Sequence, residues 1–233
     1  IVKAADYERL GFRCQVHGAP TYDLDTVDRR VRRFMGDGAV NQGAYHESLN
    51  LAALWKLPVV YVIENNKYSM GTTIDRSSAM RNCLAERADG YGIVWDIANG
   101  EDLYEVRAKA HNALERAHKH SLPTVLEIDT YRYYGHSVAD ANAKKYRSPD
   151  EIERYKAHHD PLRLWQKRLV DEGVMTVEEI EKLDESIKDE ANAAAQFALD
   201  SEFPAPETIF EDVYWEVDNN TEAGNTGRHF FGD

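Results

Sequence analysis

The chain has 233 residues, a formal net charge of −13 and a sequence pI near 5.2. Because such an acidic chain is repelled by phosphate backbones and anionic lipid, we expect neither nucleic acid nor a membrane as a partner. No apolar run is long enough to cross a bilayer, and two cysteines, Cys14 and Cys83, do not make a disulfide framework or a zinc site.

The N-terminal stretch, residues 1–33, ends on the basic run DRRVRR. Four arginines do not suit a strand that is buried on both faces of a parallel sheet, so a strand here has little support from its own sequence. We interpret residues 1–33 as a divergent or truncated N-terminal segment. A truncated or wrongly spliced reading frame and a genuine divergent start are the two alternatives.

The next part of the chain predicts a βαβ unit. Gly36-Asp37-Gly38 is followed by apolar residues at mostly helical spacing over residues 41–56, and then by a run rich in Val and Ile over residues 57–63. A strand end, a glycine turn, a helix and a second strand indicate a parallel sheet, in which ligands bind at the carboxyl ends of the strands. Asp37 and the pair Asn65-Asn66 leave their strands at that shared edge.

This edge carries groups that suit a cation and a phosphate. The two glycines allow backbone to approach a phosphate closely, and the start of the following helix favours anions. Magnesium prefers hard oxygen ligands and often shares them with substrate phosphates. Asp37, an asparagine side chain and a backbone carbonyl supply such oxygens, so we predict a divalent cation that holds a diphosphate.

Later segments continue the alternation of strands and helices. Strands are predicted over residues 93–97 and 124–131, separated by a helix that opens at Glu101-Asp102 and ends near residue 119. After the second of these strands, Arg132 and His136 again put polar groups at the carboxyl edge. Three further helices are expected to start at the capping residues Ser148, Asp160 and Thr176.

The string GDGAVNQGAYHESLN opens a segment in which 26 residues lie between Gly38 and Asn65-Asn66, and this spacing resembles the thiamine diphosphate signature. Together with ENNKYSMGT, TYRYYGHSVAD and YRSPDEIERY, it resembles the α subunit of the pyruvate dehydrogenase decarboxylating component, in the 2-oxo acid dehydrogenase family. The similarity covers about Phe34 to Tyr214. It implies an α/β, three-layer thiamine diphosphate-binding fold with a parallel sheet over residues 34–160, and a C-terminal helical extension and tail over residues 161–233.

The resemblance also implies ligands for the cofactors, which are thiamine diphosphate and Mg²⁺. Asp37, the side chain of Asn66 and the carbonyl of Tyr68 match the residues that bind the metal. Gly38 and Ala39 match backbone contacts to the diphosphate.

Three more residues are assigned by the resemblance. Met70 matches a residue near the cofactor's rings, with packing in the core as the alternative. Arg132 and His136 match residues that hold the phosphate end of the cofactor. His136 is also the expected catalytic residue in acyl transfer to the lipoyl arm, because an imidazole exchanges protons near neutral pH; a structural loop histidine is the alternative.

The implied reaction is the oxidative decarboxylation of pyruvate, with transfer of the acetyl group to a lipoyl acyltransferase core. The resemblance implies an α2β2 heterotetramer in which a β subunit supplies the other half of the site, so we expect no turnover by this chain alone. Acetoin-cleaving and branched-chain 2-oxo acid dehydrogenases are the alternatives. A non-catalytic remnant that only binds the β subunit is an alternative of another class.

Two further expectations follow from the resemblance. Ser137 matches a regulatory phosphorylation site of mitochondrial relatives, but Lys144-Lys145 occupy the place of a later regulatory serine. We therefore expect no kinase control and a bacterial-type, cytoplasmic enzyme, with the mitochondrial matrix as the less favoured location.

Overall fold

The computed structural model describes residues 31–140, 142 and 145–210. Nearly all of the N-terminal segment and the tail from residue 211 therefore lie outside the described residues. Residues Arg29–Glu185 form one compact unit, and residues 186–210 belong to another. The boundaries at residues 33/34 and 160/161 stay predictions.

The first unit is built on a four-stranded parallel sheet. Its strands are β1 (Val31–Gly36), β2 (Val59–Asn65), β5 (Val94–Asn99) and β6 (Thr124–Asp129), in the spatial order β1-β2-β6-β5. All neighbouring pairs run parallel. The predicted βαβ unit and the parallel sheet are confirmed.

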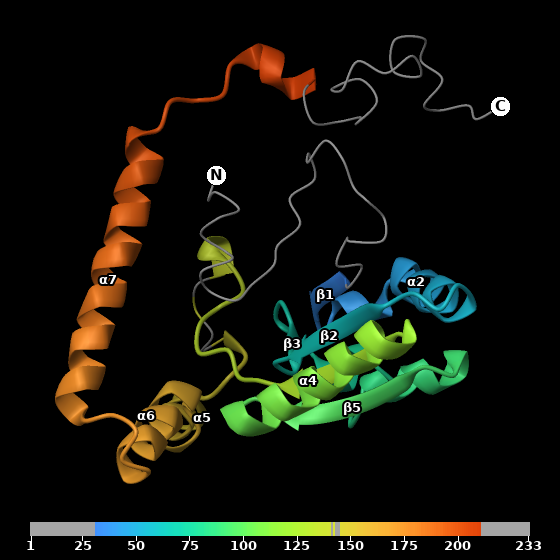
Figure 1. The fold of residues 1–233 in the computed structure, drawn as a ribbon, viewed down its shortest axis with the longest axis horizontal. Helices are drawn as coiled ribbons and strands as arrows, with labels where there is room; N and C mark the ends of the chain where they lie inside the picture. Colours follow the sequence, from blue (N-terminus) through green and yellow to red (C-terminus); the bar gives the residue numbers. More distant parts are fainter. Residues whose placement is uncertain (1–30, 141, 143–144, 211–233) are drawn as a thin grey trace. The chain divides into compact units, whose positions relative to one another are not determined.

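Helical segments cover both faces of this sheet. In β2, Val59, Tyr61 and Ile63 pack into a buried cluster with α2 (Gly43–Leu54) and the 3-10 helix η2 (Ala85–Tyr91). The intervening Val60 and Val62 pack against α4 (Leu103–His120), which lies along the sheet in Figure 1. Because successive strand residues point to opposite faces, this alternation gives three layers, as expected.

The end of the basic run does form a strand, because β1 begins at Val31 and includes Arg32 and Arg33. Among the described residues β1 pairs only with β2, so it lies at an edge of the sheet, and Phe34 is 62% exposed. The arginines suggested that a strand here has little support, and the structure shows that β1 forms nevertheless. An edge strand tolerates polar and charged side chains because one of its sides is open to solvent.

Several element boundaries differ from the predicted ones. The helix expected over residues 41–56 is divided into the 3-10 turn η1 (Ala39–Asn41) and α2, because Gln42 between them is extended, with φ −77° and ψ 143°. Strand β2 continues to Asn65, so the first asparagine of the pair belongs to the strand. A hairpin of β3 (Tyr68–Ser69) and β4 (Thr72–Thr73) follows, then α3 (Ile74–Ser77).

The C-terminal part is helical, as predicted: α5 (Pro149–His158), α6 (Pro161–Asp171), α7 (Val177–Asp200) and the 3-10 turn η5 (Pro206–Phe210). The predicted caps are confirmed. Ser148 Oγ accepts from Glu151 N at 3.1 Å, and Asp160 Oδ1 accepts from Leu162 N at 2.9 Å. Thr176 and Glu179 form the reciprocal capping box, with N–O distances of 3.2 and 2.8 Å.

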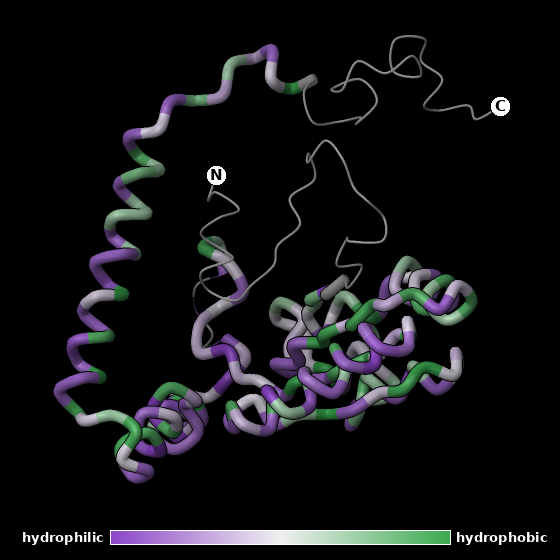
Figure 2. The backbone as a smooth tube through the Cα atoms, viewed as in Figure 1, coloured by the Kyte–Doolittle hydropathy of each residue, from purple (hydrophilic) through white to green (hydrophobic). Residues whose placement is uncertain are grey.

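The C-terminal helices differ from the sheet in the burial of their side chains. Neither α6 nor α7 has a buried residue among those described, and hydrophobic and hydrophilic turns alternate along α7 in Figure 2. None of the described helices is both long and apolar enough to span a bilayer.

Candidate functional site

The site lies where β1 and β2 end. Gly36 is in register with Glu64, so Asp37 follows β1 at the level where Asn65 ends β2. Neighbouring strands lie about 4.8 Å apart, which brings the two chain exits together. A Cβ atom added to Gly38 would lie 2.0 Å from Ser69 Oγ, so the loop after β1 rests directly on the β3–β4 hairpin. A side chain at position 38 therefore has no room.

Asp37 is the carboxylate of this edge, and it is only 5% exposed. Burial raises the pKa of Asp37; backbone N–H bonds from Asp37 and Gly38 and the charges of Arg132 and Lys67 only partly offset that rise. A carboxylate that has lost much of its hydration gains from a nearby cation. Asp37 thus fits a cation ligand.

The two asparagines of the pair have different environments. Asn65 is fully buried; its Nδ2 donates to Glu127 Oε1 at 2.6 Å, and its Oδ1 accepts from Lys67 N at 3.0 Å. In contrast, Asn66 Oδ1 is buried and has no hydrogen-bond partner among the described residues. Buried polar atoms usually have a hydrogen-bond partner, so Asn66 Oδ1 is an oxygen that the described chain leaves open to water, an ion or a ligand. Asn65 is thus structural, and Asn66 has the available oxygen.

The hairpin after Asn66 contains Tyr68 and Met70. The Tyr68 hydroxyl donates to the carbonyl of Tyr146 at 3.0 Å, which ties the hairpin to the segment before α5. Lys67 and Met70 both adopt positive φ, 68° and 53°, which is uncommon for residues other than glycine. Met70 is 61% exposed, so the alternative that it packs in the core is wrong.

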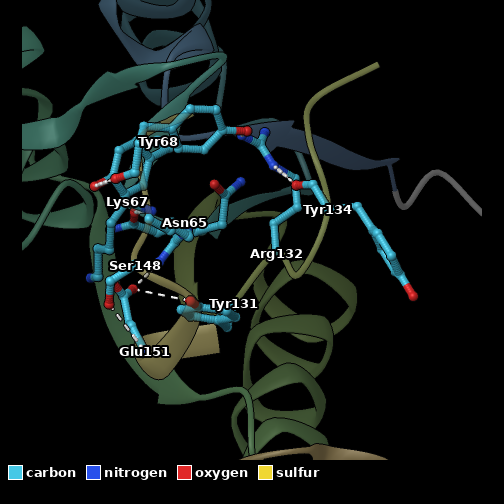
Figure 3. A network of polar contacts seen from close by, with 11 residues as sticks. Asn65, Lys67, Tyr68, Tyr131, Arg132, Tyr134, Ser148 and Glu151 are labelled. Carbon is cyan, nitrogen blue, oxygen red and sulfur yellow. Dashed lines mark hydrogen bonds and ion pairs between the residues drawn. The ribbon is translucent and has the colours of Figure 1, made fainter. Parts of the chain in front are cut away.

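Arg132 connects the loop after β6 to this hairpin. Its Nη2 donates to the carbonyl of Met70 at 2.7 Å and to the Tyr146 hydroxyl at 3.0 Å. Its Nη1 lies 3.3 Å from His136 Nδ1. Figure 3 shows Arg132 and Tyr134 beside the end of β2 that carries Asn65. The structure therefore brings Arg132, His136 and the hairpin together, as the sequence predicted for one sheet edge.

The tautomer of His136 follows from this contact. An arginine has donors only, so a hydrogen bond in this contact makes His136 Nδ1 the acceptor and assigns the proton of a neutral ring to Nε2. The backbone N–H of His136 is 3.4 Å from Asp140 Oδ2, and the ring is exposed. His136 Nε2 is thus the ring atom with a proton to donate.

Two buried charged residues of this site were not predicted. Glu127 of β6 is fully buried and accepts three hydrogen bonds, from Asn65 Nδ2, Leu84 N and Ala85 N. Arg147 is 5% exposed and donates to the carbonyl of Asn66 at 2.6 Å. A charged residue inside the apolar run TVLEID was a visible signal for Glu127. No local signal marks Arg147, because its partner Asn66 lies 81 residues away.

The donor set fits a magnesium ion that shares its ligands with a phosphate. No cluster of three or more His, Cys, Asp or Glu side chains with metal-binding geometry occurs in the described part of the chain. Asp37 and Asn66 Oδ1 would be the protein ligands of such an ion, and magnesium typically takes one or two carboxylates plus substrate phosphates. A cavity of about 610 Å³ is lined by Tyr68 and Arg147 together with Lys67, Tyr131 and Glu151 among others, but its lining includes neither Asp37 nor Asn66.

Comparisons with known proteins agree with this geometry. The family model described as "Dehydrogenase E1 component" matches residues 26–207. The chain is similar to "Pyruvate dehydrogenase E1 component subunit alpha" of Rhizobium meliloti (strain 1021), with 40% identity over 180 residues, 77% of this chain and 51% of that relative. The protein of the same name from Zymomonas mobilis is 43% identical over 77% of this chain and 50% of its own length.

A eukaryotic relative matches the same part of the chain. The "Pyruvate dehydrogenase E1 component subunit alpha, testis-specific form, mitochondrial" of Rattus norvegicus is 37% identical over 77% of this chain and 45% of its own length. The chain thus spans about half the length of the curated relatives it matches. Its parallel sheet with helices on both faces is the thiamine diphosphate-binding fold that the resemblance implied. Since the family model covers most of the sequence, the chain belongs to the dehydrogenase E1 component family.

Proposed function

We propose that this chain is the α subunit of a pyruvate dehydrogenase E1 component, which decarboxylates pyruvate with thiamine diphosphate and passes the acetyl group to a lipoyl group. Family membership and the names of the relatives support this reading. The structural observation that carries it is the pair of oxygens at adjacent strand ends, the buried Asp37 carboxylate and the unpaired Asn66 Oδ1.

In this proposal Asp37, Asn66 and the carbonyl of Tyr68 hold Mg²⁺. The backbone of Gly38 and Ala39 contacts the diphosphate. Only glycine fits at position 38, because a Cβ atom there would collide with Ser69, and so no side chain covers this backbone. When bound, thiamine diphosphate supplies the carbanion chemistry. The chain's own contribution is to bind, orient and neutralise the charged end of the cofactor.

The loop after β6 has the second role. Arg132 and His136 contact the phosphate end, and Met70 lies near the cofactor's rings. Since His136 Nδ1 faces Arg132, the proton that His136 donates to a phosphate oxygen or exchanges during acyl transfer is on Nε2. The exposed position of Met70 is compatible with a contact to a ligand or to another subunit.

The active assembly is proposed to be an α2β2 heterotetramer on a lipoyl acyltransferase core, in the bacterial cytoplasm. Residues 34–160 form the thiamine diphosphate-binding domain and residues 161–233 the helical extension. A β subunit supplies the groups that grip the aminopyrimidine, so the isolated chain is inactive. Addition of the β subunit should restore pyruvate turnover.

Calorimetry tests the cofactor site. The full chain, purified with a β subunit, is titrated with thiamine diphosphate in the presence of Mg²⁺. Binding should occur in the parent, be lost in Asp37→Ala and be weakened to a still measurable level in Asn66→Ala, while Asp96→Ala, a carboxylate of β5 with a half-exposed side chain, should bind like the parent. Absence of binding in the parent would support the remnant alternative.

Substrate assays test the reaction. Pyruvate, acetoin and 3-methyl-2-oxobutanoate are compared with the same preparation and a lipoyl acceptor. Pyruvate should have the highest kcat/KM. A preference for acetoin or for the branched 2-oxo acid would move the assignment to those relatives without affecting the cofactor site.

A further inference from the structure

We propose that Glu127 and Arg147 are positioning residues for the Asn65–Asn66 dipeptide, and that together they aim Asn66 Oδ1 at the cation. Glu127 holds the side chain of Asn65, and Arg147 holds the backbone carbonyl of Asn66. Neither residue touches the cation in this proposal, which rests on the proposed function of the site.

Three hydrogen-bond donors surround the side chain of Glu127, so only a carboxylate can accept from all of them. Its two oxygens accept from Asn65 Nδ2 at 2.6 Å, Leu84 N at 2.7 Å and Ala85 N at 2.9 Å, and the residue is 0% exposed. A carboxylate has acceptors only, so it satisfies all three donors. A glutamine would turn an NH₂ group toward one of these donors and leave it without an acceptor.

The bond from Glu127 also sets the orientation of the Asn65 amide. Since Nδ2 faces Glu127, Oδ1 of Asn65 is the atom that accepts from Lys67 N at 3.0 Å. Lys67 has a positive φ of 68°, and this bond stabilises that uncommon backbone conformation. Asn66 is thus flanked on both sides by residues whose position depends on Glu127.

Arg147 fixes the same dipeptide from a distant part of the sequence. Its Nη2 donates to the carbonyl of Asn66 at 2.6 Å and its Nη1 to Glu151 Oε1 at 2.7 Å. Its guanidinium lies 4.4 Å from the ring centroid of Tyr68 and 4.0 Å from that of Tyr131. Figure 3 shows the side chains of Tyr68, Tyr131 and Glu151 around the loop that follows β2. Only a planar cation with several donors makes these contacts together.

These contacts matter because Asn66 does not orient its own oxygen. Asn66 Oδ1 has no hydrogen-bond partner in the described chain, so the direction of the side chain depends on how firmly its backbone is held. Residues that orient metal ligands without touching the metal are known to change metal affinity by about 10–100-fold. Glu127 and Arg147 are placed for that role.

The experiment measures Mg²⁺ affinity at saturating thiamine diphosphate, by calorimetry, on the full chain purified with a β subunit. Glu127→Gln and Arg147→Met should each raise the Mg²⁺ Kd by about 10-fold or more, as other orienting residues do. Two matched controls should leave it unchanged. Glu64→Gln alters an exposed carboxylate of β2, and Arg168→Met removes an arginine that also contacts a tyrosine ring and a glutamate four residues later.

A double-mutant cycle separates positioning from general loss of structure. If Glu127 acts through Asn66, Glu127→Gln adds nothing to the effect of Asn66→Ala on the Mg²⁺ Kd, and the same holds for Arg147→Met. Additive effects would overturn the proposal, as would an unchanged Kd in both single variants. Arg147→Lys keeps the charge but not the paired bonds, so its Kd should fall between those of the parent and Arg147→Met.

Hydrogen exchange without cofactor gives an independent readout. Amides of residues 66–73 should exchange faster in Glu127→Gln and in Arg147→Met than in the parent, and not in the two controls. Equal exchange in all variants would overturn the positioning role even where cofactor binds. If exchange changes as expected but the parent binds no Mg²⁺ and thiamine diphosphate, the positioning contacts are real and the proposed function is the part that fails.

Discussion

The carboxyl edge of the sheet and the C-terminal helices differ in which side chains they bury and which they expose. At the edge, charged and polar residues are buried and hydrogen-bonded: Asn65 donates to Glu127, and Arg147 donates to the carbonyl of Asn66. On α7 and the segment after it, large apolar side chains are exposed, among them Ile187, Phe197, Leu199, Phe203 and Ile209. Buried polar groups fix one arrangement, whereas exposed apolar groups are available for a partner.

Two arginines make the comparison concrete. Arg147 and Arg168 each contact a tyrosine ring, and each pairs with a glutamate four residues later. Their side chains are 4% and 44% exposed, respectively. The same local pattern therefore gives a buried link to Asn66 in one case and a surface ion pair of small energetic value in the other.

The largest difference is expected for leucines of the two regions. Leu49→Ala removes a fully buried side chain of α2, and its free energy of unfolding should fall by about 2–5 kcal/mol. Leu199→Ala alters a residue of α7 that is 79% exposed, and the change should be within about 0.5 kcal/mol. Urea unfolding of the full chain measures both, and an equal loss would show that α7 packs as the sheet helices do.

A difference of similar size is expected for two glutamates of adjacent strands. Glu127→Ala leaves three buried donors without an acceptor, which should cost about 3 kcal/mol or more. Glu64→Ala changes an exposed side chain, so its effect should be within about 0.5 kcal/mol. Thermal unfolding compares them. A wild-type-like midpoint for Glu127→Ala would mean that its three bonds add no net stability.

Two helix caps should have equal local effects and different functional ones. Ser148→Ala and Thr176→Ala each remove a side-chain cap and should each cost about 1 kcal/mol. Only Ser148 adjoins Arg147, so only its replacement should weaken binding of thiamine diphosphate with Mg²⁺. Circular dichroism measures stability, and calorimetry measures cofactor binding. Weaker binding in Thr176→Ala would contradict the prediction that only the cap next to Arg147 affects the site.

The smallest effect is expected for Asp37→Asn in the absence of metal. Burial raises the pKa of Asp37, so the folded state holds the proton more tightly than the unfolded state does. Stability therefore falls as pH rises from the ordinary carboxyl pKa through the folded one, and the charged form is costly at neutral pH. Asp37→Asn should raise Tm at pH 7 and lose that advantage as the pH is lowered toward the ordinary carboxyl pKa.

Addition of Mg²⁺ and thiamine diphosphate should reverse the order of the two proteins at pH 7, because only the aspartate gains a cation. Differential scanning fluorimetry with and without ligand makes the comparison. A Tm for Asp37→Asn below that of the parent in both conditions would show that the carboxylate has a structural role instead.

The sequence by itself determined the order of strands and helices and the edge of the sheet at which the site lies. Periodicity and spacing predicted the parallel sheet, the helices on it and the shared edge for Asp37 and Asn65-Asn66, because these depend on local alternation and on βαβ geometry. The caps at Ser148, Asp160 and Thr176 were readable for the same reason, since a cap bonds to residues two or three positions away.

Only the tertiary structure decided which asparagine is available and what holds it. Asn65 and Asn66 have the same side chain and are adjacent in the sequence. Their hydrogen bonding differs because Asn65 donates to Glu127, which lies 62 residues away. Arg147 reaches Asn66 across 81 residues, and β1 tolerates the exposed Arg33 because the strand lies at an edge of the described sheet. Contacts between distant segments depend on how the strands are ordered in space, which no local pattern of residues encodes.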